Sequence, residues 1–132
     1  MDPMEWDWTR AIFDHVHLRV ADLGRSKEFY AAVLEPLKIP LLLETDEAAQ
    51  FANLALSDDG PVSERVHLAF VAPDRAAVDA FHGAGLAAGA LDNGPPGVRP
   101  YGPPAMEYYA AYLLDPDGHN VEAVHRSFPD AG

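Results

Sequence analysis

Two segments of this sequence share one residue pattern at a fixed offset of 52 positions. The matching residues are His15, Asp22, Phe29 and Leu34 in the first segment and His67, Asp74, Phe81 and Leu86 in the second. A repeat of this length indicates one supersecondary unit used twice, in which neither half needs to bury its apolar face alone. The chain is therefore expected to fold into two related halves, with two histidines at equivalent points of a pseudo-symmetric structure.

Composition narrows the class of protein. The chain has 132 residues, of which 48% are hydrophobic, so it is long enough for one domain with a proper core. Its net charge of −12 repels phosphate backbones and anionic lipid, so we expect no nucleic-acid partner. No apolar run approaches the ~18 residues of a membrane span. The chain lacks cysteine and begins with the acidic stretch MDPMEWDW, so a cytoplasmic protein is expected.

The first half begins with a short arm and continues with a strand pattern. Residues 1–12 are expected to form an N-terminal arm, and in residues 13–20 polar side chains alternate with apolar ones. Such alternation is typical of a strand with one buried and one polar face. The polar face of this strand carries His15, His17 and Arg19.

A helix is expected to follow this strand. Asp22 is a suitable N-cap. The apolar stripe after it consists of Leu23, Tyr30, Val33, Leu34 and Leu37. Two stretches, 39–44 and 50–57, are then predicted as strands.

The second half repeats this order. Residues 65–71 form a predicted strand with His67 on its polar face, and a helix that begins at Asp74 carries Val78, Phe81 and Leu86. Residues 94–104, GPPGVRPYGPP, are expected to form a loop without regular structure, because proline fixes φ and removes a backbone donor.

A hairpin closes the second half. Its strands are predicted at 108–114 and 119–126, and the sequence Asp-Pro-Asp-Gly between them suits a type I turn. Each half is interpreted as a βαβββ module. We expect an α+β fold in which the paired modules, about 13–60 and 64–126, form a curved cup-shaped mixed sheet with helices on its outer face. Residues 127–132 would form a tail.

The two equivalent histidines suggest a metal site. His15 and His67 would point into the concave face, and Glu122 on the last strand alternates away from its apolar neighbours. Two imidazoles and one carboxylate suit a divalent ion, and zinc, iron(II), manganese, nickel or cobalt would all fit. Three protein ligands leave coordination positions open for water or substrate.

Three segments carry a resemblance to a known family: DHVHLRVADLGRSKEFYAAVL, RVHLAFVAPDRAAVDAF and YAAYLLDPDGHNVEAV. The chain resembles the vicinal oxygen chelate superfamily, which includes glyoxalase I, fosfomycin-resistance thiol transferases, bleomycin-resistance proteins and extradiol dioxygenases. The resemblance implies a cup of paired modules and a metal that binds vicinal oxygens of a small substrate. The implied ligands are His15, His67 and Glu122. It also implies a homodimer, whose site sometimes shares ligands from both chains.

The sequence departs from some members of that family. Where glyoxalase I is expected to have a fourth, carboxylate ligand, the matching residue is Asn53, so a true lactoylglutathione lyase is disfavoured. Tyr112 falls where the fosfomycin enzymes have a substrate-contacting tyrosine. The only basic residue after Tyr101, apart from histidine, is Arg126, so a phosphonate substrate is disfavoured.

The first functional interpretation is a metal-dependent enzyme, with lyase or isomerase chemistry ahead of thiol transfer and ring cleavage. Tyr112 and His17 are the candidate catalytic residues. The candidate substrate-binding residues are Arg19, Asn53, Tyr101 and Tyr108.

Two alternatives stay open. The acidic charge and the tyrosines fit a bleomycin-resistance-like protein that sequesters a ligand without catalysis, and a scaffold with an empty cup is the third possibility. Of the other histidines, His82 and His119 are expected to be exposed, and His125 faces away from Glu122.

Overall fold

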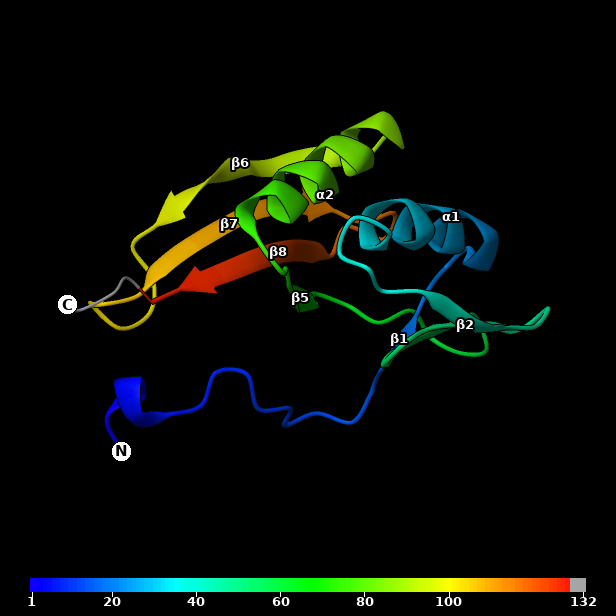
Figure 1. Cartoon of the computed structure of the whole chain (residues 1–132). Coiled ribbons are helices and arrows are strands. Elements are labelled where there is room, and N and C mark those ends of the chain that lie inside the picture. The colour runs from blue at the N-terminus through cyan, green and yellow to red at the C-terminus, as the bar shows by residue number, and fades with distance from the viewer. Residues whose placement is uncertain (129–132) are drawn as a thin grey trace.

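The two halves fold into two four-stranded mixed sheets with the same strand order (Figure 1). The computed structural model describes residues 1–128, and residues 129–132 of the predicted tail lie outside the described part. The first module consists of β1 (Val16–Arg19), α1 (Leu23–Leu34), β2 (Leu41–Glu44), β3 (Ala48–Phe51) and β4 (Leu54–Ser57). The second consists of β5 (His67–Val71), α2 (Arg75–Ala87), β6 (Leu91–Arg99), β7 (Glu107–Leu114) and β8 (Asn120–Ser127).

In each sheet the first strand pairs in parallel with the last. The orders are β1-β4-β3-β2 and β5-β8-β7-β6, and the remaining pairs are antiparallel. The predicted α+β fold of paired βαβββ modules is confirmed. Residues before β1 contain one short 3₁₀ turn, η1 (Pro3–Glu5).

Two expectations about strands were wrong. Residues 50–57 hold the end of β3, a turn and β4 rather than one strand, and Ala52 in the turn has a left-handed φ of 48°. Residues 94–99 of the expected loop belong to β6. β6 is an edge strand with register shifts on either side of Gly94, and an edge position with bulges tolerates prolines that a central strand would not.

Both helices begin where the sequence predicts. Asp22 accepts a hydrogen bond from the backbone N of Arg25 (3.1 Å), and Asp74 from that of Ala77 (2.8 Å). No helix among the described residues is long and apolar enough to cross a membrane.

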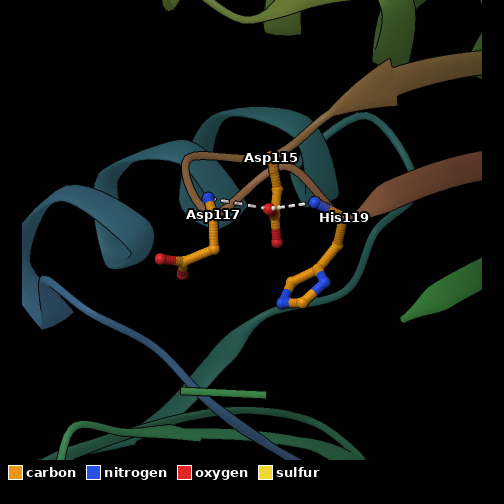
Figure 2. A group of neighbouring side chains, drawn as sticks. All are labelled: Asp115, Asp117 and His119. Atoms are coloured by element: carbon orange, nitrogen blue, oxygen red, sulfur yellow. Dashed lines mark hydrogen bonds between the residues drawn. The ribbon is translucent and has the colours of Figure 1, made fainter. Parts of the chain in front are cut away.

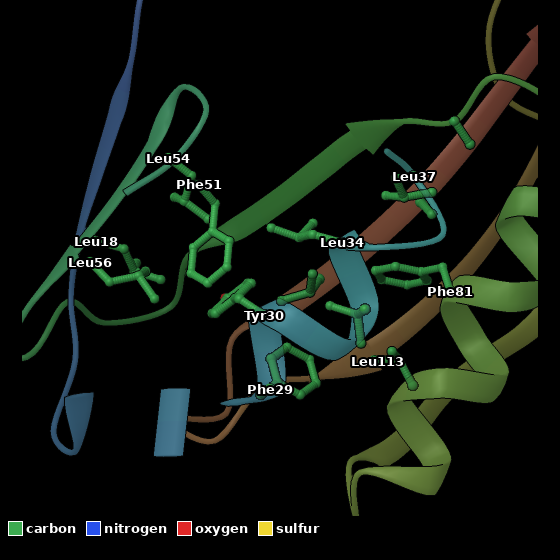
Figure 3. Close-up of a cluster of buried hydrophobic side chains, with 14 of the residues drawn as sticks. Leu18, Phe29, Tyr30, Leu34, Leu37, Phe51, Leu54, Leu56, Phe81 and Leu113 are labelled. Atoms are coloured by element: carbon green, nitrogen blue, oxygen red, sulfur yellow. The ribbon is translucent and has the colours of Figure 1, made fainter. Parts of the chain in front are cut away.

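One core runs through both modules, because the two helices contact each other as well as their own sheets (Figure 3). All five residues of the predicted α1 stripe are buried in it. The α2 stripe is correct at Val78 and Phe81 but wrong at Leu86, which is 44% exposed. The buried position there is Gly85, which packs against Leu113 of β7.

Two glycines of α2 give a matched test of this packing. A Cβ added at Gly85 would lie 2.2 Å from Cδ1 of the fully buried Leu113, whereas one at Gly83 would meet nothing within 4 Å. We expect Gly85→Ala to lower the free energy of unfolding by about 1–3 kcal/mol, through overpacking. Gly83→Ala should raise it by about 0.5–1 kcal/mol, because alanine loses less backbone entropy. Urea unfolding of both variants measures the difference. Equal effects would contradict the close helix–sheet contact.

Candidate functional site

A cavity of about 580 Å³ opens on the face of the second sheet that is turned away from α2. Alternation along β7 defines this face: Tyr109 and Leu113 point to α2, and Tyr108 and Tyr112 point to the cavity. The lining residues come from all four strands and the β6–β7 loop. They include His67, Asn93, Arg99, Tyr101, Tyr108, Tyr112, Asn120, Glu122 and Arg126.

His67 and Glu122 meet inside this cavity. β5 and β8 are parallel neighbours in which Ala69 pairs with Glu122, so the two side chains lie on one face of adjacent strands. His67 Nε2 donates to Glu122 Oε1 at 2.8 Å, and the Tyr108 hydroxyl donates to Glu122 Oε2. Glu122 is 1% exposed, whereas the His67 side chain is 53% exposed. The carboxylate is therefore fixed in a buried position, and the imidazole remains accessible.

The two tyrosines beside Glu122 are hydrogen-bond donors rather than bases. Burial, followed by the hydrogen bond to Glu122, raises the pKa of the Tyr108 phenol well above its usual value. Burial, with the charge of Glu122, raises the pKa of Tyr112 to about 12. Both phenols therefore keep their protons at neutral pH. Tyr109 instead donates to Asp79 Oδ1 (2.6 Å), as expected if only one of the two adjacent tyrosines faces the cavity.

His15 does not join this pair within one chain. Its Nδ1 lies 2.8 Å from Asp14 Oδ2, and its side chain is 66% exposed. Among residues 1–128, the only three His, Asp or Glu residues whose ligand atoms lie within 4.8 Å of one another are Asp115, Asp117 and His119. One chain thus brings together two of the three predicted ligands.

Three other predicted site residues lie on the first module. Asn53 is in the β3–β4 turn, and its side chain donates to the backbone oxygen of Asp14 (2.5 Å). His17 Nε2 lies 2.6 Å from Ser57 Oγ. Arg19 Nε donates to Asp59 Oδ1 at 3.3 Å. None of the three lines the second-sheet cavity of the described chain.

Strand register identifies which residue of the first module corresponds to Glu122. Ala69 pairs with Glu122, and its equivalent 52 residues earlier, His17, pairs with Ala55. The counterpart of Glu122 is therefore Ala55, and Asn53 corresponds to Asn120. The first module has no carboxylate at either position, so the second module alone supplies a glutamate to its polar face.

Two predictions about the other histidines were wrong. His119 and His82 are buried, not exposed. His119 Nδ1 accepts from the backbone N of Val66 (3.1 Å), and His82 Nε2 donates to Oδ1 of the exposed Asp92 (2.9 Å), so each buried ring has a polar partner. His125 donates to the backbone oxygen of Ala72 (3.0 Å), on the side away from Glu122 as predicted.

Asp115, Asp117 and His119 form a cluster in the β7–β8 turn (Figure 2). Asp115 Oδ1 accepts from the backbone N of Asp117 and of His119, both at 2.9 Å, and Oδ2 accepts from the Tyr30 hydroxyl at 2.6 Å. Asp117 Oδ1 accepts from the backbone N of Ala21 (3.3 Å). The donors to Asp115 and Asp117 come from the turn itself, from Tyr30 of α1 and from Ala21, so the cluster acts as a junction between the two modules.

The sequence identified neither arginine of the cavity, and the expectation that basic residues are too few for a phosphonate counted only the residues after Tyr101. Arg99 lies at the end of β6, in the segment expected to be a loop, and it lines the cavity together with Arg126. The prolines of β6 interrupt the alternation that would predict a strand there. No other feature of the sequence indicates that Arg99 and Arg126 lie in one cavity.

Comparison with known proteins assigns the family. The family model of the Glyoxalase/Bleomycin resistance protein/Dioxygenase superfamily matches residues 12–123. The chain belongs to this superfamily. A glyoxalase/bleomycin resistance protein from Albidiferax ferrireducens T118 is 34% identical, with a TM-score of 0.75 over 88% of this chain and 100% of that chain. A lactoylglutathione lyase from Agrobacterium tumefaciens is 23% identical, with a TM-score of 0.62 over 87% and 92% of the two chains, which shows a common fold. No curated protein matches the sequence.

The second module of this superfamily member has donors that fit a divalent ion. An imidazole nitrogen and a carboxylate oxygen face each other, and a tyrosine hydroxyl orients the second carboxylate oxygen. Orientation of a ligating carboxylate by a further hydrogen bond is a common feature of metal sites. Within one chain this site has two of the three predicted ligands, because His15 lies elsewhere.

Proposed function

We propose that this superfamily member is a metal-dependent enzyme that acts on a small molecule with vicinal oxygens, first of all as a lyase or isomerase. The observation that carries the proposal is the buried Glu122 carboxylate, which faces the accessible His67 imidazole inside a 580 Å³ cavity. Burial of a carboxylate is costly unless a cation or donors compensate it. His67 and Tyr108 donate to the two oxygens of Glu122, and a divalent ion held by Glu122 and His67 would take over the compensation that the His67 hydrogen bond gives.

The proposed ligand set is His15, His67 and Glu122, and we assign His15 to a second copy of the chain. Both histidine side chains are accessible, and Val71 on the same strand as His67 is 77% exposed, so the face around the cavity has room for a partner. In such a homodimer, His17, Arg19 and Asn53 would approach the cavity from the same direction as His15.

The chemistry follows from the groups present. When bound, a divalent ion polarises an oxygen of the substrate and stabilises negative charge that develops there. Tyr112, with its raised pKa, donates a hydrogen bond toward the substrate oxygens, and Tyr108 holds the Glu122 carboxylate in place. Ala55 stands at the position of the first module that is equivalent to Glu122. No second glutamate is available there as a base, so the lactoylglutathione lyase reaction is not the one we favour.

A sequestering protein is the second candidate function. The favouring observation is the cluster of three tyrosines, Tyr101, Tyr108 and Tyr112, which line the cavity. Binding of a ligand with equal affinity before and after treatment with a chelator, and without turnover, would support this candidate.

Metal content tests the proposal directly. Protein purified without chelator should carry about one divalent ion per chain, and His15→Ala and His67→Ala should each lose it. His125→Ala, at a histidine that bonds the Ala72 carbonyl instead, should retain it. Inductively coupled plasma mass spectrometry measures all four proteins. If wild type and His67→Ala carry the same negligible amount of metal, the proposal is wrong.

A mixture of the two single variants tests the shared site. Co-refolded His15→Ala and His67→Ala chains form heterodimers in which one site has both histidines, so metal binding should return. A site built within one chain predicts no recovery, because every chain then lacks one ligand.

A further inference from the structure

We infer that the substrate carries an oxyanion, a carboxylate or phosphate group, which Arg99 and Arg126 bind at the wall of the cavity. The inference rests on the proposed function, since it places the anion in the same cavity as the His67–Glu122 pair. It concerns a different part of the substrate from the vicinal oxygens.

The charge of the cavity is opposite to that of the chain. The chain has 21 acidic and 9 basic residues, yet the described residues that line the cavity include two arginines and one carboxylate. Both oxygens of that carboxylate, Glu122, already accept hydrogen bonds from His67 and Tyr108. The positive charge of Arg99 and Arg126 therefore remains available to a bound ligand. A local positive field in an acidic protein attracts small anions into the cavity.

Neither arginine is neutralised by a carboxylate among residues 1–128. Ion pairs in that part of the chain engage other basic residues, as in Arg19–Asp59 and Arg75–Glu107. By contrast, Arg126 Nη1 donates to the sulfur of Met106 (3.3 Å), and Arg99 donates to the backbone oxygen of Pro95. These neutral acceptors leave most of the five donors of each guanidinium group available.

Aromatic rings hold both guanidinium groups in place. Arg126 Cζ lies 4.1 Å from the centre of the Trp8 ring and 5.0 Å from that of Tyr108, and Arg99 Cζ lies 5.6 Å from that of Tyr112. Stacking on an aromatic face positions an arginine without cancelling its charge. Trp8, near the N-terminus, thus holds one of the cavity residues, Arg126, in place. Two preorganised forks of donors are suited to bidentate recognition of a carboxylate or phosphate.

The Tyr101, Tyr108 and Tyr112 rings favour a planar apolar body beside the anion, so we choose aromatic probes. Isothermal titration of the chelator-treated full chain would compare benzoate and phenyl phosphate with neutral benzamide and cationic benzylamine. We expect the anions to bind at least tenfold more tightly than benzamide, and benzylamine to bind most weakly. The better of the two anions identifies the oxyanion as carboxylate or phosphate.

Matched variants locate the binding site. Arg99→Gln and Arg126→Gln should each weaken anion binding at least tenfold, whereas Arg25→Gln, an equal change of charge on α1, should change it less than twofold. Equal binding of anions and benzamide, or an equal loss in Arg25→Gln, would overturn the inference. Anion binding is measured on chelator-treated protein, and metal content on protein purified without chelator, so the two results are independent. If the protein carries metal as expected but does not prefer the anions, only this inference is refuted. Selective anion binding without metal content refutes only the proposed function.

Discussion

Asp115→Ala should lower the free energy of unfolding by about 3–5 kcal/mol, the largest stability effect that we expect. The side chain is buried and accepts hydrogen bonds from two backbone N–H groups and from the Tyr30 hydroxyl. Alanine would leave all three donors unpaired, and each unpaired buried donor costs about 1–3 kcal/mol. The turn between β7 and β8 would also lose its link to α1. Urea unfolding at neutral pH measures the change.

Two further variants make this prediction sharper. Asp117→Ala removes the same charge from the same turn but only one long hydrogen bond, to Ala21, so it should cost less than about 1 kcal/mol. Tyr30→Phe removes one of the three donors and should cost about 1–2 kcal/mol, which gives a measurable value even if Asp115→Ala does not fold. Similar losses in the two aspartate variants would show that Asp115 is not the centre of the junction.

Glu122→Gln should reduce the affinity for zinc or cobalt by at least about 100-fold, or roughly 2.7 kcal/mol. Glutamine keeps the size of the side chain and an acceptor for Tyr108, so the fold should be retained, but it removes the only carboxylate that faces His67. A neutral amide is a poor ligand for borderline divalent ions in comparison with a carboxylate. Competition titration with a chromophoric chelator measures the affinity.

Glu107→Gln is the matched control for this variant. Glu107 is an exposed residue of the neighbouring strand β7, and its carboxylate pairs with Arg75 outside the cavity. The metal affinity of the Glu107→Gln variant should equal that of wild type. An unchanged metal affinity in Glu122→Gln would show that Glu122 is not a metal ligand, and the proposed metal-dependent mechanism would then be wrong.

The asymmetry between the two modules has a consequence for the chemistry. The modules keep one histidine each at equivalent positions, but Glu122 corresponds to Ala55. A site with one carboxylate ligand leaves more coordination positions for substrate than a site with two. The proposed enzyme would therefore depend on tyrosines with raised pKa and on its arginines for orientation, rather than on a second glutamate.

The residue pattern alone determined the modules and much of the local structure. Strand alternation and the N-caps Asp22 and Asp74 depend on neighbouring residues, so they are legible in a single sequence. The β6 strand was missed because prolines normally exclude a strand, and only its edge position in the sheet makes them tolerable. Leu86 was assigned to the wrong face because the close approach of α2 to Leu113 selects Gly85 there.

The sequence by itself determined the two-module α+β architecture and named His67 and Glu122 as candidates for one site, because both follow from periodicities within short segments. Tertiary structure alone decided that these two residues meet while His15 lies apart, and that Arg99 and Arg126 share their cavity. The contact between His67 and Glu122 joins residues that are 55 positions apart. Such contacts depend on strand register and on the packing of one sheet, which no local pattern encodes.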